Sequence, residues 1–225
     1  MDRIFWLTRT SAKIPADDDW LSKSERIVLA GFRFPKRRND WLLGRWTAKE
    51  AIRLFLAGRN FLLPSLEIRS AADGAPEAFF EGRPAGVSLS ISHSRDRSLC
   101  VAGSRAMSVG CDLEWIEPRE DNFENDYFVQ EEISFVAQSP FAREVASNLI
   151  WSAKETTLKI IRKGLSRDTR SVVINPEFDG NEQSWNRWTG RCLESSKLFH
   201  GWWRTCEGYI YTIASDRPTS HPEPL

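Results

Sequence analysis

Two acidic residues, Asp112 and Glu114, lie two positions apart in the segment VGCDLE at residues 109–114. The segment is short and apolar enough for a β-strand, and side chains two apart in a strand project from the same face. An isolated pair of acids on one face is most often the solvent side of an edge strand. Here the intervening apolar residues face the other way, and Gly110 permits another backbone to approach closely. A hard cation bound by oxygen ligands would relieve the repulsion between the two carboxylates.

A third acid, Glu155, lies in the segment WSAKETTLK at residues 151–159, together with Lys159. On a helix these two side chains share a face, and the simplest interpretation is an ordinary ion pair worth roughly 0.2–0.5 kcal/mol. Taken with the acidic strand, however, the helix offers a carboxylate for a metal ion and an ammonium group for a phosphate. Phosphoryl chemistry needs both charges near each other.

The segment SISHS at residues 90–94 places Ser92 beside His93 at the end of a predicted strand. Adjacent side chains in a strand point to opposite faces, so a nucleophile and base pair of the hydrolase type is disfavoured. A histidine at a strand exit most often makes a structural hydrogen bond. With a neighbouring serine and backbone amides it could equally hold a phosphate.

Strands and helices alternate along the chain in the pattern expected of a mixed protein. Turn residues at Pro64, Asp73-Gly74 and Gly82-Arg83-Pro84 separate short apolar runs. We expect strands at residues 4–8, 66–69, 77–80, 87–92, 98–103, 108–115, 172–174, 184–192, 202–206 and 209–214. We expect one helix from an N-cap among the aspartates at 17–19 through about Ala30, one from about residue 39 to a stop at Gly58, and two more at 123–137 and 140–162.

The pentapeptide WTAKE at residues 46–50 recurs as WSAKE at residues 151–155, which is 105 positions later. Ala-Lys-Glu alone is common in helices because all three residues favour the helix. The shared tryptophan, the shared hydroxyl residue and an offset near half the chain length favour duplication instead. We therefore expect two lobes of similar design, residues 1–108 and 109–225, with the acidic strand at their join.

The composition indicates one large or two small folded domains without a broad charged surface. Of 225 residues 41% are hydrophobic, and Lys plus Arg and Asp plus Glu both total 31. Zero net charge argues against a nucleic-acid partner. A local basic cluster, Arg33, Lys36, Arg37 and Arg38, is a place for a polyanion, although clusters of this length are more often solvated faces.

Cysteine usage and hydropathy indicate where the protein works. Four cysteines without a C-x-x-C pairing predict free thiols in a reducing compartment. We find no secretory signal and no apolar run of about 18 residues, so we expect a cytoplasmic protein that does not enter a membrane. The tail at residues 215–225 is rich in Pro and Ser, and we expect its last ten or so residues to fray, leaving His221 without a role.

Together these segments resemble the larger, two-lobed family of 4'-phosphopantetheinyl transferases, the type that activates peptide and polyketide synthetases. Five segments match in the family's order: LLGRWTAKEAI at 42–52, EGRP at 81–84, SISHS at 90–94, GCDLE at 110–114 and WSAKETTLKIIRKGLS at 151–166. The specific part is GCDLE combined with W-S-x-K-E and its following lysine, because the other motifs are weak alone.

The resemblance implies an α+β fold of two similar lobes related by a pseudo-twofold axis, with coenzyme A in the cleft between them. It implies that Asp112, Glu114 and Glu155 hold Mg2+, or Mn2+, against the pyrophosphate of coenzyme A. It also implies that Lys159 contacts the same phosphates.

For the nucleotide end of coenzyme A and its 3'-phosphate, the resemblance implies contacts from Arg83, Ser92 and His93. Arg45 matches a motif arginine that serves either the ligand or the interface between lobes. Arg162 departs from the family because a glycine is usual there. The family's early basic contacts to the 3'-phosphate fall among Arg26, Arg33, Arg37 and Arg38, and the resemblance does not single out one of them.

The implied activity is transfer of 4'-phosphopantetheine from coenzyme A to a serine of an apo carrier protein, with release of adenosine 3',5'-bisphosphate. Glu155, directly or through a metal-bound water, would take the serine proton, and Glu132 is a second candidate for the base. We expect a monomer that meets a small, acidic, helical carrier through Phe123, Tyr127 and Phe128, or else packs some of these rings in its core. A non-catalytic relative that binds coenzyme A or a carrier, and a metal-dependent nuclease, are the alternatives.

Overall fold

The computed structural model describes residues 1–57, 61–162 and 168–225. Its strands are β1 (Ile4–Thr10), β2 (Leu66–Ser70), β3 (Pro76–Phe80), β4 (Arg83–Pro84), β5 (Val87–Ser94), β6 (Arg97–Ser104), β7 (Val109–Trp115), β8 (Val172–Pro176), β9 (Asn186–Cys192), β10 (Leu198–Cys206), β11 (Tyr209–Ser215) and β12 (Glu223–Pro224). Its α-helices are α1 (Lys23–Ala30), α2 (Pro35–Phe55), α3 (Phe123–Tyr127), α4 (Gln130–Gln138) and α5 (Arg143–Ile161), and short 3-10 turns lie at Ser11–Lys13, Leu63–Ser65 and Thr169–Ser171. The fold is therefore a mixture of helices and sheets, as predicted.

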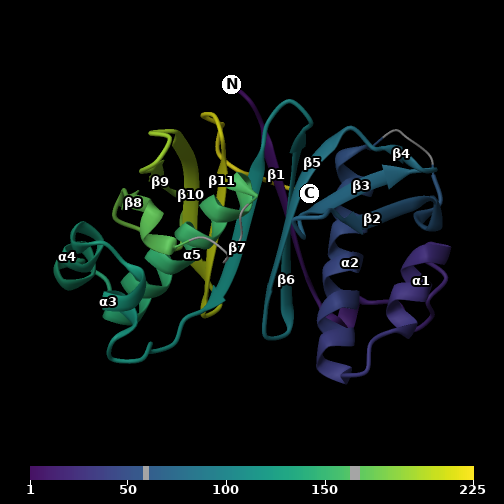
Figure 1. The fold of residues 1–225 in the computed structure, drawn as a ribbon, viewed down its shortest axis with the longest axis horizontal. Coiled ribbons are helices and arrows are strands. Elements are labelled where there is room, and N and C mark those ends of the chain that lie inside the picture. Colours follow the sequence, from purple (N-terminus) through teal and green to yellow (C-terminus); the bar gives the residue numbers. More distant parts are fainter. Residues whose placement is uncertain (58–60, 163–167) are drawn as a thin grey trace.

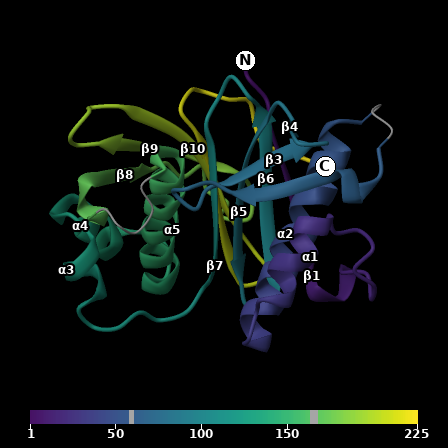
Figure 2. The same ribbon diagram turned by 45° about the vertical axis from the view of Figure 1, so that its right-hand side comes forward.

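Two larger sheets stand side by side, each with its own long helix (Figure 1). One has the order β12-β1-β6-β5 and is accompanied by α2, whereas the other has the order β7-β11-β10-β9-β8 and is accompanied by α5. A small sheet, β2-β3-β4, completes the N-terminal half (residues 1–108). Figure 2, turned by 45°, shows α1 in front of α2 on the outer side of this half.

The order of strand pairing recurs in the two halves. In the N-terminal half β1 pairs antiparallel with β6, which pairs with β5; in the C-terminal half (residues 109–225) β7 pairs antiparallel with β11, which pairs with β10. Strands β1 and β7 both have seven residues and begin 105 positions apart, the offset of the two pentapeptides. This recurrence agrees with duplication. The pseudo-twofold axis stays a prediction.

Most predicted strands are present, but several helix ends differ from the expectation. The N-cap of α1 is Ser22, which shares a capping box with Glu25, and not one of the aspartates at 17–19. Helix α2 begins earlier than expected because Pro35 is tolerated at its first position. The helix expected at 123–137 is divided into α3 and α4. The stop expected at Gly58 lies outside the described residues.

The C-terminal tail is ordered, which corrects the prediction that it frays. Strand β12 pairs parallel with β1, and the backbone N–H of Leu225 donates to the carbonyl oxygen of Trp6 at 2.9 Å. The ring of His221 packs edge-on against Trp202 and Trp185. A proline-rich segment can join a sheet only at its edge, and the edge of β1 offers that place. The tail therefore connects the C-terminal half to the N-terminal half.

Strands β5 and β7 form the seam between the halves. Alternate serines of β5 face the edge of β7: the backbone N–H of Cys111 donates to Ser90 Oγ at 3.1 Å, and that of Trp115 donates to Ser94 Oγ at 3.2 Å. Side-chain hydroxyls thus satisfy backbone groups that a neighbouring strand would otherwise pair. The seam fixes the acidic strand β7 against β5.

Among the described residues, no helix combines the length and the apolar character that a bilayer crossing requires.

Candidate functional site

Asp112 is anchored at the seam by three donors. Its carboxylate accepts hydrogen bonds from Ser92 Oγ at 2.7 Å, Ser152 Oγ at 2.9 Å and Lys159 Nζ at 2.8 Å, and the residue is only 4% exposed. Ser92 belongs to β5, whereas Ser152 and Lys159 belong to α5. The site is therefore built from both halves of the chain.

Glu114 projects from the same face of β7 as Asp112, as strand alternation predicts. Its carboxylate accepts from Trp151 Nε1 at 3.1 Å and pairs with Arg119 at 3.2 Å. Burial and the negative charge of Asp112 raise the pKa of Glu114, although Arg119 counteracts them. The apolar residues between the acids, including Cys111 and Leu113, face a buried cluster on the other side of the strand.

Glu155 reaches the same region from α5 but lacks a counter-charge of its own. Its Oε1 atom is buried and has no hydrogen-bond partner in the described parts of the chain. Burial, followed by the charges of Asp112 and Glu114, raises the pKa of Glu155 to about 7, and Lys159 only partly opposes this. A carboxyl group with such a pKa can exchange a proton near neutral pH.

Lys159 pairs with Asp112 and not with Glu155, which corrects the expected helical ion pair. Its ammonium group also donates to the carbonyl oxygen of Cys111 at 3.0 Å and to Ser92 Oγ at 3.1 Å. Burial alone would lower the pKa of Lys159, but Asp112 raises it, so the group is positively charged. Lys159 thus places one fixed positive charge among the three carboxylates.

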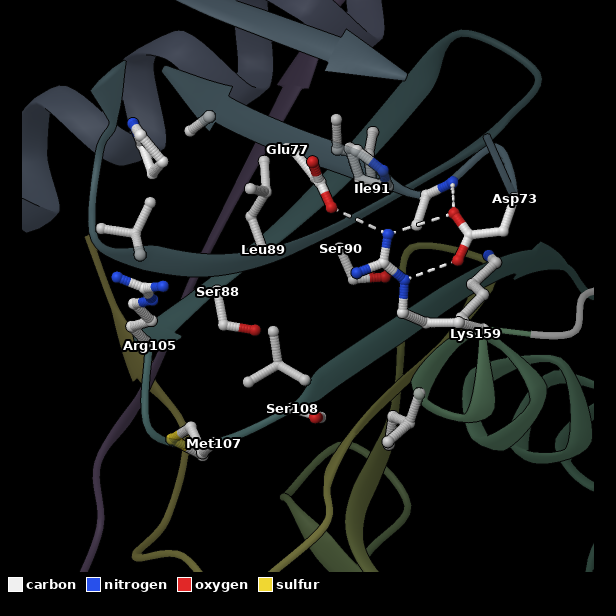
Figure 3. Close-up of a pocket in the computed structure, with 18 of the residues that line it drawn as sticks. Asp73, Glu77, Ser88, Leu89, Ser90, Ile91, Arg105, Met107, Ser108 and Lys159 are labelled. Atoms are coloured by element: carbon white, nitrogen blue, oxygen red, sulfur yellow. Dashed lines mark hydrogen bonds and ion pairs between the residues drawn. The ribbon is translucent and has the colours of Figure 1, made fainter. Parts of the chain in front are cut away.

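Beside Lys159 lies a cleft of about 610 Å3 between the halves (Figure 3). Strand β5 contributes Ser88 and Ser90, the turn before β7 contributes Arg105 and Ser108, and α5 contributes Lys159. This volume lies within the ordinary range for small-molecule and cofactor sites. One end is crossed by Arg162, which pairs with Asp73 and Glu77 of the N-terminal half at 2.6 and 2.9 Å.

The three carboxylates do not form a finished metal centre. Within the ranges that the structure describes, no three or more His, Cys, Asp or Glu side chains converge closely enough to hold an ion. The donor chemistry nevertheless fits a hard cation, since the three carboxylates influence one another electrostatically and Glu155 Oε1 is buried without a partner. Asp112, Glu114 and Glu155 could thus serve as ligands for a hard cation, and their binding of Mg2+ stays a prediction.

Glu132 is fully buried in an ion pair of the core, which corrects its assignment as a second candidate base. Its carboxylate pairs with Lys154 Nζ at 2.8 Å and accepts from the backbone N–H groups of Val129 and Ile174. Both side chains of the pair are 0% exposed. A carboxylate whose oxygens are all engaged in the core cannot reach a substrate. Glu132 and Lys154 instead fix α4, α5 and β8 together.

The residues expected at the nucleotide end are not gathered into one cluster. Ser92 points inward to Asp112, whereas His93 and Arg83 are exposed. Arg45 lies over the ring of Trp41, with its Nη2 atom 3.5 Å from Ser70 Oγ. The structure therefore joins Ser92 directly to the carboxylates and leaves the roles of the other three residues as predictions.

The rings expected to meet a carrier protein are largely packed inside the C-terminal half. Phe128 is buried beneath Lys154, and Phe123 and Tyr127 pack edge-on against Trp151. Tyr127 alone among the three is exposed enough to meet a partner. Phe128 completes the core, which is the alternative use predicted for some of these rings, and the carrier contact through Tyr127 stays a prediction.

Sequence reasoning missed two residues that orient the carboxylates, Ser152 and Trp151. Ser152 donates to Asp112, and Trp151 donates to Glu114. Both lie in the recurring pentapeptide, whose counterpart in the N-terminal half has Thr47 bonded to its own helix at Leu43 O. The sequence did contain a sign of these roles, because the hydroxyl of Ser152 and the indole N–H of Trp151 lie on the same predicted helix as Glu155.

Comparisons with known proteins bear on the C-terminal half. Residues 108–214 match the family model described as the 4'-phosphopantetheinyl transferase superfamily. A curated holo-[acyl-carrier-protein] synthase of Geobacillus sp. (strain WCH70) is 34% identical over 68 residues, which are 29% of this chain and 57% of that protein. A crystal structure of holo-[acyl-carrier-protein] synthase from Neisseria meningitidis aligns with a TM-score of 0.38 and 21% identity, over 46% of this chain and 98% of that one. Thus residues 108–214, the segment that carries Asp112, Glu114, Glu155 and Lys159, are similar in sequence to the 4'-phosphopantetheinyl transferase superfamily.

Proposed function

We propose that this chain transfers the 4'-phosphopantetheine group of coenzyme A to a serine hydroxyl of an apo carrier protein, as a two-lobed, Mg2+-dependent transferase. The observation that carries the proposal is that Asp112, Glu114 and Lys159 act electrostatically on Glu155 at the seam, within the segment similar to the superfamily. The curated synthase that this chain matches over 68 residues supports the reaction class by its name.

Asp112, Glu114 and Glu155 are the ligands for Mg2+ in this proposal. When bound, the ion would offset the negative charge of the pyrophosphate and of the leaving bisphosphate. Ser92 and Ser152 hold the Asp112 carboxylate in a fixed orientation. Trp151 holds Glu114 in the same way.

Glu155 is the general base in this proposal. The serine oxygen of the carrier attacks the β-phosphorus, its proton passes to the Glu155 carboxylate, and the bond to the leaving adenosine 3',5'-bisphosphate breaks. In the cation-free protein, burial and the neighbouring carboxylates raise the pKa of Glu155 to about 7, which makes its carboxylate more basic than an ordinary one. A bound Mg2+ would lower that pKa again. Lys159, fixed between Asp112 and the cleft, would donate to phosphate oxygens.

The cleft between the halves would hold coenzyme A. It adjoins Lys159, so a nucleotide in the cleft could present its pyrophosphate to the carboxylates (Figure 3). Arg105 lines the same cleft and adds positive charge toward an anionic ligand, whereas the charge of Arg162 is balanced by Asp73 and Glu77.

Mass spectrometry of an apo carrier protein incubated with the enzyme, coenzyme A and Mg2+ tests the proposal. We expect a mass gain of one phosphopantetheine on the carrier, and its loss with Glu155→Gln. Several carriers, from fatty acid, polyketide and peptide synthesis, should be tried. No gain with any of them, while coenzyme A still binds, would favour a non-catalytic relative.

A further inference from the structure

A second pocket, of about 290 Å3, lies between the loop that follows β7 and the first turns of α5. The loop, α3 and α5 each contribute to its lining. Arg143 of α5 donates through Nε and Nη2 to the carboxylate of Glu124 of α3, at 3.1 and 3.0 Å. The side-chain amide of Asn148 donates to the carbonyl oxygen of Glu117 in the loop at 2.8 Å. These hydrogen bonds hold α3 and the loop against α5, so the pocket is preformed.

Two polar groups at this pocket are buried without a hydrogen-bond partner in the described ranges of the chain. Ser147 is 2% exposed, and its Oγ atom has no partner there. Arg119 Nε is likewise buried and unpartnered, although the Nη2 atom of the same side chain donates to Glu114 at 3.2 Å. Buried polar groups in folded proteins are nearly always hydrogen-bonded. A hydroxyl and a guanidinium N–H that both line one pocket therefore indicate a ligand with polar groups of its own.

The carboxylates lie between this pocket and the cleft. Arg119 pairs with Glu114 and lines the second pocket. Lys159 pairs with Asp112 and lines the cleft. Each cavity therefore adjoins the carboxylates through one cationic side chain.

The same order is found along α5. Lys159 lies at the cleft, Glu155 lies with the carboxylates, and Ser147 lies at the second pocket. The step from Glu155 to Ser147 is a little over two helical turns, roughly 12 Å. An extended chain of about this length that begins at the carboxylates can therefore reach Ser147.

The two cavities differ in charge. The second pocket is lined by four carboxylates and two guanidinium groups, those of Glu120, Asp121, Glu124, Glu144, Arg119 and Arg143. The cleft is lined by three cations and two carboxylates, those of Arg105, Lys159, Arg162, Asp73 and Glu77. A phosphate is therefore favoured in the cleft, whereas an uncharged chain with N–H donors suits the second pocket.

We infer that the second pocket receives the pantetheine arm of coenzyme A, an inference that rests on the proposed function. Coenzyme A is a linear molecule in which the pyrophosphate joins an anionic nucleotide to this uncharged arm, which contains two amides. With the nucleotide in the cleft and the pyrophosphate at the carboxylates, the arm extends toward Arg119 and Ser147. Its backbone has about as many atoms as four peptide residues, which extend over roughly 13 Å. That length matches the step from Glu155 to Ser147.

The unpartnered groups of the pocket complement those of the arm. Arg119 Nε donates to one amide carbonyl, the Ser147 hydroxyl bonds the other amide, and the carboxylates of the lining accept from amide N–H groups. The second pocket thus holds the group that is transferred, and the cleft holds the group that leaves.

Isothermal titration calorimetry with coenzyme A and with adenosine 3',5'-bisphosphate tests this pocket, because only coenzyme A has the arm. Ser147→Ala removes the hydroxyl, and we expect Kd for coenzyme A to rise about three- to tenfold. Ser147→Val also fills part of the pocket, so the rise should be about tenfold or more. Kd for the bisphosphate should stay within about twofold of wild type in both variants, since that ligand does not reach Ser147.

Thr157→Val is the matched control. Thr157 is a buried hydroxyl residue of the same helix, and it donates to the carbonyl oxygen of Ala153 at 2.9 Å. This variant should leave both Kd values unchanged. Thermal unfolding shows whether each variant folds, and Ser147→Ala, which adds no atoms, serves as the test if Ser147→Val does not fold.

The possible results separate the pocket from the proposed reaction. An unchanged Kd for coenzyme A in Ser147→Ala and Ser147→Val would remove the pocket as the site of the arm and leave the transferase proposal standing. Equal weakening of both ligands would also remove it, because Ser147 would then act on the fold or on the nucleotide. Selective weakening of coenzyme A, in a protein that modifies no carrier, would keep the pocket and overturn the transferase proposal. Failure of the wild type to bind coenzyme A would overturn both.

Discussion

Arg9 of β1 and Glu50 of α2 form an ion pair in the N-terminal half, with Nη2 and Oε2 3.6 Å apart. At the common offset of 105 positions, β7 and α5 carry Glu114 and Glu155. Glu50 therefore has the cation Arg9 as its neighbour, whereas Glu155, at the equivalent position, has the anion Glu114. A bound cation, as proposed above, would add to the positive charge that Arg119 and Lys159 already bring to these two glutamates.

Glu114→Arg should remove the dependence of stability on Mg2+, because the new guanidinium can serve Glu155 as Arg9 serves Glu50. At an Mg2+ concentration about 100 times Kd, binding should stabilise the wild type by about 2.7 kcal/mol. Thermal unfolding with and without Mg2+ measures this difference. The exposed Glu120→Arg is the matched control and should keep the full shift. Equal shifts in wild type and Glu114→Arg would contradict the assignment of Glu114.

Glu155→Gln should stabilise the cation-free protein more at pH 8 than at pH 5. The folded pKa of Glu155 is about 7, above its ordinary value of 4.5, so the folded state retains a proton that the unfolded state releases. The wild-type protein therefore becomes less stable as the pH rises from about 4.5 through 7, because Glu155 loses its proton in a site that disfavours the charge. Glutamine has no proton to lose there, so the variant avoids this loss of stability. Urea unfolding of both proteins in EDTA at several pH values provides the measurement. A difference between variant and wild type that does not change with pH would show that Glu155 is not strained by its neighbours.

The same variant separates stability from catalysis. It should lose transfer by several orders of magnitude even where it is the more stable protein, since amide nitrogen and oxygen cannot replace the carboxylate as a base. Mass spectrometry of the carrier at pH 8 measures the rate. Near wild-type transfer would remove Glu155 from the mechanism.

Strand periodicity was sufficient to predict one part of the site. Alternation alone placed Asp112 and Glu114 on one face of β7, because the opposite residues are apolar and enter a core. The recurring pentapeptide placed Glu155 on a helix. These predictions depend on local geometry, which the sequence determines within a few residues.

The pairing of charges could not be predicted in this way. Lys159 reaches across to Asp112 on β7 and not along its own helix to Glu155, because packing of α5 on the strand brings that carboxylate nearer. Glu132 lies in the first turn of α4, a position where acidic residues are common. Its partner Lys154 lies on another helix, α5, so the sequence around Glu132 does not reveal the pair. Tertiary contacts determine both ion pairs, and no residue spacing in the sequence predicts such contacts.

Lys154→Met should lower the free energy of unfolding by about 3–5 kcal/mol, because it leaves the buried carboxylate of Glu132 without its counter-charge. Lys49→Met should have a similar effect in the N-terminal half, where Lys49 pairs with buried Glu25 at 2.6 Å. Arg53→Met is the control: its pair with Glu50 is partly exposed and should contribute only about 0–1 kcal/mol.

Urea unfolding measures all three lysine and arginine variants. Adding Glu132→Gln to Lys154→Met should recover part of the loss, since the double variant no longer buries an uncompensated charge. A loss below 1 kcal/mol for both Lys49→Met and Lys154→Met would show that the pairs are dispensable.

Gly110→Ala and Gly44→Ala should have opposite effects on stability. A Cβ atom at Gly110 would lie 2.3 Å from the carbonyl oxygen of Thr156 and 2.7 Å from Ile160 Cγ1, so α5 would have to move away from β7. We expect a loss of about 1–3 kcal/mol or more, with a fall in transfer because α5 carries Glu155. At Gly44 the nearest atom, Ile91 Cγ2, lies at an ordinary 3.5 Å, and alanine should favour the helix by up to about 1 kcal/mol. Urea unfolding and carrier modification, measured on both variants, check this; a tolerated Gly110→Ala would mean that the close packing of α5 on β7 is not what positions the carboxylates.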